Sequence, residues 1–304
     1  LNNEKIFYKL KSDLANSNSI NTEMQGSLDP EMEIKGAKVI KSEYQVPFLA
    51  HATMEPMNCT ALIEDNTCEI WLGTQAPDFS RSSAAKTAGV REHNTLVQNQ
   101  YLGGGFGRRL EADLAAEAVA IARELPGVPI KLIWSREEDM RHDYYRPAAM
   151  AQMVGSVVPG MGQITAWQAF VASAPMLAGY TRRNMGFAFG NIAALAADRF
   201  EVEEAIRPLY KITNRQVSWT KSETPVPTGN WRSVSNSFGA FFTESFFDEL
   251  AIHLAADPYT LRRRMLANKP RHLAVLDLGE NGALFSIEIR TGDLRTRNAD
   301  LTDP

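Results

Sequence analysis

The run from Tyr101 to Asp113 reads Tyr-Leu-Gly-Gly-Gly-Phe-Gly-Arg-Arg-Leu-Glu-Ala-Asp, and it is the part of this 304-residue sequence best suited to chemistry. Four glycines within five positions cost backbone entropy unless the chain takes positive φ or approaches another body closely. Alanine and leucine content predicts a helix over 110–125, whose N-terminal dipole would face the loop. With the charges of Arg108 and Arg109, the loop favours a large anionic ligand.

Two common phosphate-binding motifs do not fit this loop. A dinucleotide fingerprint beginning at Gly103 requires glycine at its sixth position, where the sequence has Arg108. A P-loop requires a Gly-Lys pair, which the sequence lacks. Two alternatives stay open from the loop alone. One is a glycine-rich turn packed against a neighbouring backbone, and the other is an unrelated nucleotide-binding α/β protein that uses the loop for phosphate.

Further motifs accompany the glycine loop in a fixed order. They are Val46–Thr60, Trp71–Pro77, Ile133–Pro147, Asn230–Val234 and Lys269–His272. Together they resemble the molybdopterin-binding large subunit of the molybdenum hydroxylases, the xanthine dehydrogenase and aldehyde oxidase superfamily. The nearest likeness is to the isoquinoline 1-oxidoreductase beta-subunit type, over about residues 37–278.

The resemblance implies a molybdenum ion held by the dithiolene of a pterin cofactor, usually the cytosine dinucleotide form in bacteria. It implies an oxidoreductase that hydroxylates aldehydes or N-heterocycles with water-derived oxygen. No protein side chain is expected to ligate the metal. The residues that it assigns to cofactor binding are Gly104, Gly105, Phe106, Gly107, Arg108, Gln75 and Arg232. Two of them also receive catalytic roles: Gln75 as a donor to the apical oxo group, and Arg232 as a cation near the metal.

From the residues alone, each of these side chains has a structural alternative. Gln75 can be a solvated loop glutamine, and Arg232 can cap carbonyl groups or pair with Glu244. Trp231 either lines a substrate funnel or packs. Glu55, in the Met-Glu-Pro-Met turn, either contacts the cofactor region or makes a structural hydrogen bond.

The two cysteines, Cys59 and Cys68, limit the redox chemistry of the chain. An iron–sulfur cluster needs four ligands, so this sequence cannot hold one by itself. The resemblance therefore implies a partner, a small subunit with two [2Fe–2S] clusters. Both cysteines are expected to be buried free thiols. No histidine pair has i, i+4 spacing, and His142-Asp143 is predicted to be a polar surface or domain contact.

The resemblance also points to something that this sequence lacks. Full-length members carry their general base, a glutamate in a Gly-Glu-Pro-type motif, far beyond the region matched here. Glu280 follows Leu-Gly but lacks the prolines after it, which argues against that role. The sequence is therefore expected to be part of a longer polypeptide and to supply the first half of a cofactor cradle. A non-catalytic binding or interaction module is the alternative.

Composition excludes some classes of partner. A net charge of −4 gives no electrostatic footprint for nucleic acid. No apolar stretch reaches the roughly 18 residues of a membrane-spanning helix. No secretory signal opens the sequence, so localisation is expected from the resemblance, with the periplasm slightly favoured over the cytoplasm.

With 44% hydrophobic and 22% charged residues, the sequence predicts a globular α+β (mixed α/β) domain, an incomplete molybdopterin-binding fold. Residues 1–36 are expected to be a linker or the end of a preceding domain, 37–278 the molybdopterin-binding domain, and 279–304 an unassigned tail. Strands are predicted over 39–46, 61–64, 68–72, 130–134, 154–158, 164–172 and 217–220. Helices are predicted over 80–88, 110–125, 239–254 and 258–267, with loops and short helices over 173–200.

Overall fold

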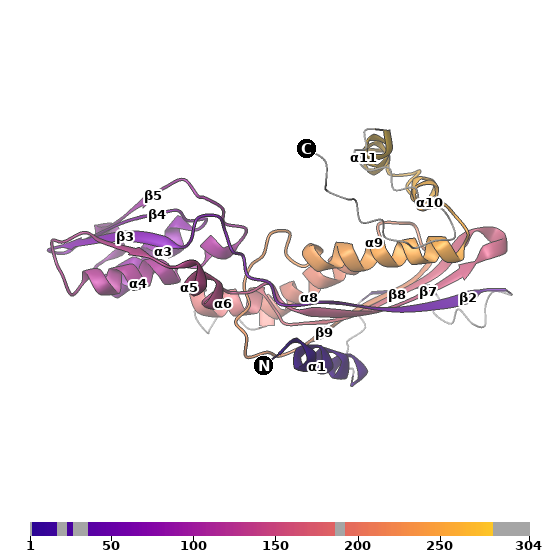
Figure 1. The fold of residues 1–304 in the computed structure, drawn as a ribbon, viewed down its shortest axis with the longest axis horizontal. Helices are drawn as coiled ribbons and strands as arrows, with labels where there is room; N and C mark the ends of the chain where they lie inside the picture. Colours follow the sequence, from indigo (N-terminus) through magenta and orange to yellow (C-terminus); the bar gives the residue numbers. More distant parts are fainter. Residues whose placement is uncertain (1, 17–22, 27–35, 186–191, 282–304) are drawn as a thin grey trace, which may run out of the picture.

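The computed structural model describes residues 2–16, 23–26, 36–185 and 192–281, which form two lobes arranged end to end (Figure 1). The small lobe contains a four-stranded sheet in the order β5-β4-β3-β6. The large lobe contains a five-stranded sheet in the order β1-β9-β8-β7-β2. The chain leaves the large lobe after β2, builds the small lobe, and returns at β7. The predicted α+β class is confirmed.

The strands are β1 (Glu23–Gln25), β2 (Lys38–Val46), β3 (Asn58–Glu64), β4 (Thr67–Leu72), β5 (Thr95–Asn99), β6 (Ile130–Ile133), β7 (Ala149–Val158), β8 (Gln163–Ser173) and β9 (Asn214–Lys221). The α-helices are α1 (Asn3–Ala15), α3 (Pro77–Ala88), α4 (Asp113–Ala122), α5 (Arg136–Arg141), α6 (Leu177–Met185), α8 (Ile192–Ile206), α9 (Asn236–His253), α10 (Pro258–Met265) and α11 (Pro270–Asn281). Short 3₁₀ turns are η1 (Glu92–Asn94), η2 (Arg108–Leu110) and η3 (Pro159–Met161).

The small lobe has one buried sheet face. Burial alternates along β3 and β4, as expected when a sheet is covered by helices on one side only. The covering helices are α3 and the alanine-rich α4, whose small side chains let it lie close to β3. The strands predicted over 61–64 and 68–72 are confirmed, and they pair as an antiparallel hairpin. Cys59 and Cys68 are buried free thiols in this core, also as predicted.

The sheet of the large lobe is buried on both faces. Helix α9 covers one face and α1 the other (Figure 1), so strand β7, which lies between β8 and β2, is almost continuously buried. Gly155 on β7 permits the close approach of α9. A Cβ at this position would lie 2.8 Å from Leu250 and 3.1 Å from Phe246. The aromatic side chains of α9 are therefore core, as their helical spacing predicts.

Helix α1 lies within residues 1–36, the segment expected to be a linker or the end of a preceding domain. Its N-terminus is capped by Asn2, which accepts from the Lys5 N–H. Leu10 and Leu14, spaced i, i+4, are buried against β7 and β8. This apolar pair anchors the helix despite its polar composition. The domain boundaries themselves stay a prediction.

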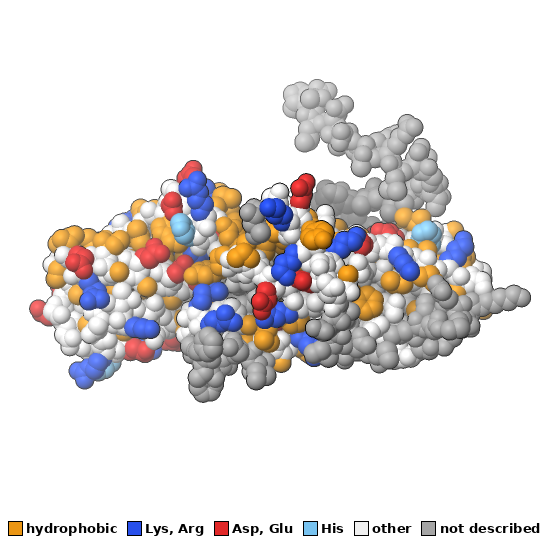
Figure 2. All heavy atoms as spheres, turned by 90° about the horizontal axis from the view of Figure 1, so that it is seen from below, with side chains coloured by type: hydrophobic (Ala, Val, Ile, Leu, Met, Phe, Trp, Pro, Cys, Tyr) orange, Lys and Arg blue, Asp and Glu red, His pale blue; other side chains and the backbone are white. Residues whose placement is uncertain are grey.

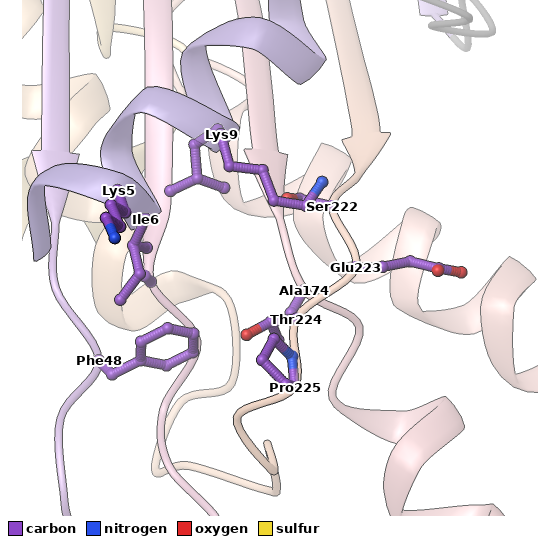
Figure 3. A pocket seen from close by; sticks show the side chains of 11 residues that line it. Lys5, Ile6, Lys9, Phe48, Ala174, Ser222, Glu223, Thr224 and Pro225 are labelled. Atoms are coloured by element: carbon purple, nitrogen blue, oxygen red, sulfur yellow. The ribbon is translucent and has the colours of Figure 1, made fainter. Parts of the chain in front are cut away.

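A small hollow lies under α1, between Ile6, Phe48, Ala174 and Pro225 (Figure 3). Its volume of about 50 Å³ is room for little more than a few water molecules. On the face drawn in Figure 2, lysine and arginine side chains are interspersed with acidic and hydrophobic ones. No helix within the described ranges is long and apolar enough to cross a membrane.

The predicted helix over 110–125 is shorter and begins later than expected. Gly107, at φ 108°, is followed by the 3₁₀ turn η2, and Glu111 then returns to an extended conformation before α4 begins at Asp113. The glycine loop therefore does not lead directly into a helix N-terminus. The region 173–200 is also more regular than predicted, because α8 is 15 residues long.

The C-terminal helix α11 packs on α10, and it lies far from the glycine loop (Figure 1). It contains position 280, so the structure gives no support to a catalytic role for Glu280. The rest of the predicted tail, 282–304, lies outside the described residues.

Candidate cofactor site at the junction of the lobes

The glycine loop, residues 103–107, lies at the end of the small lobe that faces the large lobe. Gly104 and Gly107 have φ values of 107° and 108°, and Phe106 has 54°, so three of its five residues are left-handed. A Cβ on Gly107 would lie only 2.1 Å from the carbonyl oxygen of Asn230. Glycine is required here by the close approach of a second backbone, as well as by the positive φ.

That second backbone is the strap, which we define as residues 229–234 between β9 and α9. Its Arg232 N–H donates to the carbonyl of Phe106 over 2.8 Å. Ser233 and Val234 have φ values of 67° and 44°. A β-branched residue rarely takes this conformation, so the strap is strained and depends on outside contacts to keep its shape.

Gln75 follows β4 and reaches the same loop. Its side-chain Oε1 accepts a hydrogen bond from the Gly107 N–H at 3.1 Å, and its backbone N–H donates to the Arg109 carbonyl at 2.9 Å. Since Oε1 is engaged, the side-chain NH₂ group is the part of this exposed amide left to donate. Gln75 is therefore bound to the loop and is not simply a solvated glutamine.

An open groove of about 410 Å³ lies where these parts meet. Its lining comes from both lobes and consists of Gln75, Phe106, Gly107, Leu110, Asn230, Trp231, Arg232 and Val234. Four residues that the sequence assigned to one site are thus brought together: Gln75, Phe106, Gly107 and Arg232. Gly104 and Gly105 belong to the same loop but are not part of this lining.

The Arg232 side chain is exposed in the groove. Within the part of the chain that the structure describes, it makes no ion pair. The suggested pairing with Glu244 is wrong, because that carboxylate accepts from Arg262 at 2.8 Å and from the Tyr210 hydroxyl at 2.8 Å. Arg232 is therefore a cation available to a ligand.

Arg108 does not direct its charge at the groove, which corrects the sequence expectation. Its guanidinium is buried, and it donates to both carboxylate oxygens of Asp113 at 3.0 and 2.7 Å. It also lies 5.6 Å from the ring centroid of Trp134. Burial opposes the charge, but the Asp113 hydrogen bonds and the nearby carboxylates raise the pKa of Arg108 above its usual value.

Arg109 is buried as well and holds the loop from behind. It donates to the carbonyls of Gly104 at 2.8 Å, Glu55 at 2.9 Å and Gly73 at 3.3 Å. These bonds tie the Gly104 carbonyl of the loop and the neighbouring Glu55 and Gly73 carbonyls to one buried guanidinium. Both arginines therefore stabilise the shape of the loop.

Glu55 fixes the start of the loop through a structural hydrogen bond. Its carboxylate accepts from the Gly103 N–H and from the Asn58 amide, both at 2.6 Å, and lies 3.1 Å from Arg109. Partial burial opposes ionisation of this group. The hydrogen bonds from Asn58 and Gly103 and the Arg109 charge outweigh it and hold the pKa of Glu55 below its usual value.

Sequence reasoning missed a buried pair behind the strap. His51 and Asp143 have almost no exposed side-chain surface, and His51 Nδ1 lies 2.8 Å from Asp143 Oδ1. Only His142, the neighbour of Asp143, is the exposed polar residue that was predicted. Both members of the pair lie within the motifs that carry the resemblance, but no local spacing indicates that they meet.

The lobes are also joined beside the groove. Glu111, buried after η2, accepts from Arg183 and from the Asn184 amide on α6, the latter at 3.0 Å. Arg183 stacks on the Tyr144 ring at 4.0 Å. These contacts connect the segment after η2 to α6 and to Tyr144.

The groove offers an amide donor, a free cation and an aromatic ring around left-handed backbone, which suits a large ligand bearing oxygen or phosphate groups. Among the residues that the structure describes, no cluster of three histidine, cysteine or acidic side chains could hold a metal ion.

Known proteins are similar to this chain over most of its length. The chain is 29% identical over 251 residues to a membrane-bound aldehyde dehydrogenase of Gluconacetobacter polyoxogenes, covering 81% of this chain and 32% of that protein. It is 27% identical over 261 residues to isoquinoline 1-oxidoreductase subunit beta of Brevundimonas diminuta, covering 82% and 31%. The chain thus spans about a third of the length of these relatives.

Solved structures share the fold. Quinoline 2-oxidoreductase from Pseudomonas putida 86 superposes with a TM-score of 0.62 at 20% identity, covering 81% of this chain and 32% of that one. Aldehyde oxidoreductase from Desulfovibrio gigas gives 0.59 at 17% identity, covering 79% and 25%.

A family model, the molybdopterin cofactor-binding domain, matches residues 12–266. This match removes the alternative of an unrelated nucleotide-binding protein and confirms the resemblance found in the sequence. The chain belongs to the molybdopterin cofactor-binding domain family of the molybdenum hydroxylases.

Proposed function

We propose that this chain forms one wall of a molybdenum–pterin site in an enzyme that hydroxylates aldehydes or N-heterocycles. The observation that carries the proposal is the single groove that contains Gln75, Gly107 and Arg232. These residues come from different segments and both lobes. Hydrogen bonds join the first two directly and link the third through Phe106.

The residues present fit such a cofactor. The glycine loop exposes backbone without a Cβ shield, and the NH₂ group of Gln75 can donate to an oxo ligand without adding charge. Arg232 can bind a phosphate or an oxygen-bearing substrate with two parallel N–H groups. When bound, the cofactor would supply the two-electron oxidation of the substrate. The protein's part is to bind, orient and donate hydrogen bonds.

Finer assignments follow from the same proposal. The cofactor is the cytosine dinucleotide form, and the electrons pass to a small subunit with [2Fe–2S] clusters. The only two cysteines of the chain are buried free thiols in the small-lobe core and are too few to hold such a cluster. The substrate is an aldehyde or an N-heteroaromatic compound. The proposed location is the periplasm, which the family resemblance slightly favours over the cytoplasm.

The proposal is tested by producing the complete enzyme that contains this chain, in a bacterium that makes the cofactor, and measuring molybdenum and released pterin in the purified protein. We expect both, and we expect Gly105→Val to lose most of them, because a Cβ at this position lies 2.5 Å from Gln75 Oε1. Gly160→Val is the matched control, since nothing lies within 4 Å of a Cβ there.

Two results would count against the proposal. A folded complete enzyme without molybdenum or pterin, from cells that load a related enzyme, would overturn it. Bound cofactor without any turnover in the complete enzyme would favour the non-catalytic module.

A further inference from the structure

His51 lies between two acceptors at the back of the strap. Its Nδ1 is 2.8 and 3.0 Å from the two carboxylate oxygens of Asp143, and its Nε2 is 2.9 Å from the carbonyl oxygen of Asn230. The backbone N–H of His51 also donates to Asp143. The ring therefore links the segment before β3, the segment before β7 and the strap.

The two groups that contact the His51 ring are both hydrogen-bond acceptors. An ionised carboxylate and a backbone carbonyl can only accept, whereas a neutral imidazole has one donor nitrogen and one acceptor nitrogen. Both contacts are filled only when each ring nitrogen carries a proton. The geometry thus assigns two N–H groups to His51, one for each partner.

The charges around the ring balance this arrangement. Asp143 Oδ1 also lies 3.3 Å from Arg108 Nε. The terminal nitrogens of the Arg108 guanidinium are bound by the Asp113 carboxylate. The buried Arg108 guanidinium thus lies between the carboxylates of Asp143 and Asp113. Trp231 covers the His51 ring, with centroids 4.5 Å apart.

The contact between His51 and the Asn230 carbonyl is important because the strap is strained and needs outside contacts to keep its shape. The left-handed conformations of Ser233 and Val234 persist only if neighbouring contacts over-determine the backbone. On one side, the Arg232 N–H donates to Phe106. On the other side, the Asn230 carbonyl accepts from His51, two residues before the arginine that faces the groove.

We propose that His51, oriented by Asp143, is a positioning residue that fixes the strap against the glycine loop and thereby sets the place of Arg232 in the groove. His51 does not line the groove and acts through the Asn230 carbonyl. The inference concerns contacts within the chain, and only its effect on cofactor retention rests on the proposed function.

Hydrogen–deuterium exchange of the purified chain tests this role. In His51→Ala, amide exchange in peptides covering the strap and the glycine loop should accelerate about tenfold, as expected for the loss of one buried hydrogen bond. Peptides from β7 and β8 should not change. His93→Ala is the matched control, because His93 is an exposed histidine in the small lobe.

A second variant and a spectroscopic signature keep the test decisive. Asp143→Asn retains the shape of the pair if His51→Ala fails to fold, and it should also accelerate exchange in the strap. In ¹⁵N spectra of labelled histidine, the wild-type His51 ring should show two N–H groups and the Asp143→Asn ring one. A packing role alone would leave this proton count unchanged.

Unchanged exchange in the strap of a folded His51 variant would overturn the inference, and so would acceleration spread evenly over the domain. A single ring N–H in the wild type would do the same. These outcomes differ from failure of the proposed function, which would appear as missing cofactor in a chain with a normally protected strap.

Discussion

The backbone N–H of Arg232 donates to the carbonyl of Phe106 over 2.8 Å, and this bond joins the two lobes at the candidate site. It fixes a cation from the large lobe beside the glycine loop of the small lobe. Gly107, which follows Phe106 in the chain, lies so close to the strap that no Cβ fits between them. The groove is thus defined by backbone contacts, and the side chains of Gln75 and Arg232 are placed by them.

Replacement of Gly107 by alanine should destabilise the chain strongly. The new Cβ would lie 2.1 Å from the Asn230 carbonyl oxygen. Because this oxygen belongs to the backbone and residue 107 has a φ of 108°, the clash cannot be relieved without moving the backbone of the loop or of the strap. A clash and a left-handed alanine together cost about 2 to 5 kcal/mol. Urea unfolding measures this loss. Gly89→Ala, with φ 75° and open space around its Cβ, should cost only about 1 to 2 kcal/mol. Equal losses would show that the strap does not approach the loop in solution.

Replacement of Gln75 by alanine should separate binding from turnover in the complete enzyme. The variant should keep its molybdenum and pterin but lose about 10- to 1000-fold in turnover, the usual effect of removing one donor to developing charge. Aldehyde oxidation with a dye acceptor, normalised to molybdenum content, measures the effect. Gln100→Ala removes another exposed amide, bonded to the Gln98 carbonyl, and should leave turnover intact. Wild-type rates in both variants would contradict a role for Gln75.

The stabilising effect of Glu55 should depend on pH. Its folded pKa lies below the ordinary value of 4.5, so the ionised carboxylate contributes fully above that value. The contribution disappears as the pH falls through the lowered pKa. At neutral pH, the free energy of unfolding of the wild type should exceed that of Glu55→Gln by about 1 to 2 kcal/mol. This difference in free energy should shrink below about pH 4.5. Glu64→Gln, on the exposed end of β3, is the control. A gap that widens in acid would contradict the assigned hydrogen bonds.

The two thiols should be unreactive in the folded chain. Burial, with a smaller effect from Cys68, raises the pKa of Cys59 to about 12, and burial raises the pKa of Cys68 to about 11. At pH 8 the thiolate form that attacks reagents is therefore scarce. A thiol-specific dye should label neither cysteine until denaturant is added, and then both. Rapid labelling of the native chain would mean that the small-lobe core opens readily.

Much of the fold could be predicted because its signals are local. The hairpin of β3 and β4, the aromatic spacing of α9 and the glycine loop all follow from residues near one another in sequence. Helix α1 was missed because polar residues surround its apolar pair, Leu10 and Leu14. The late start of α4 was missed because a 3₁₀ turn after Gly107 leaves no strong compositional sign.

The site was only partly predictable for the same physical reason. The sequence pointed to Gln75 and Arg232, and the groove brings them together. It did not indicate that Arg108 is neutralised by Asp113 behind the loop, or that His51 meets Asp143. A buried ion pair between distant segments is set by how the lobes pack, and no periodicity or spacing records it.

The division of the groove between two lobes has a consequence for biogenesis. A nascent chain whose sheets have formed but have not yet docked holds only part of the lining on each piece. The cofactor then finds no complete receptor until the strap has closed on the glycine loop. Insertion of the cofactor would therefore be a late event, and its retention would report that the two lobes have joined correctly.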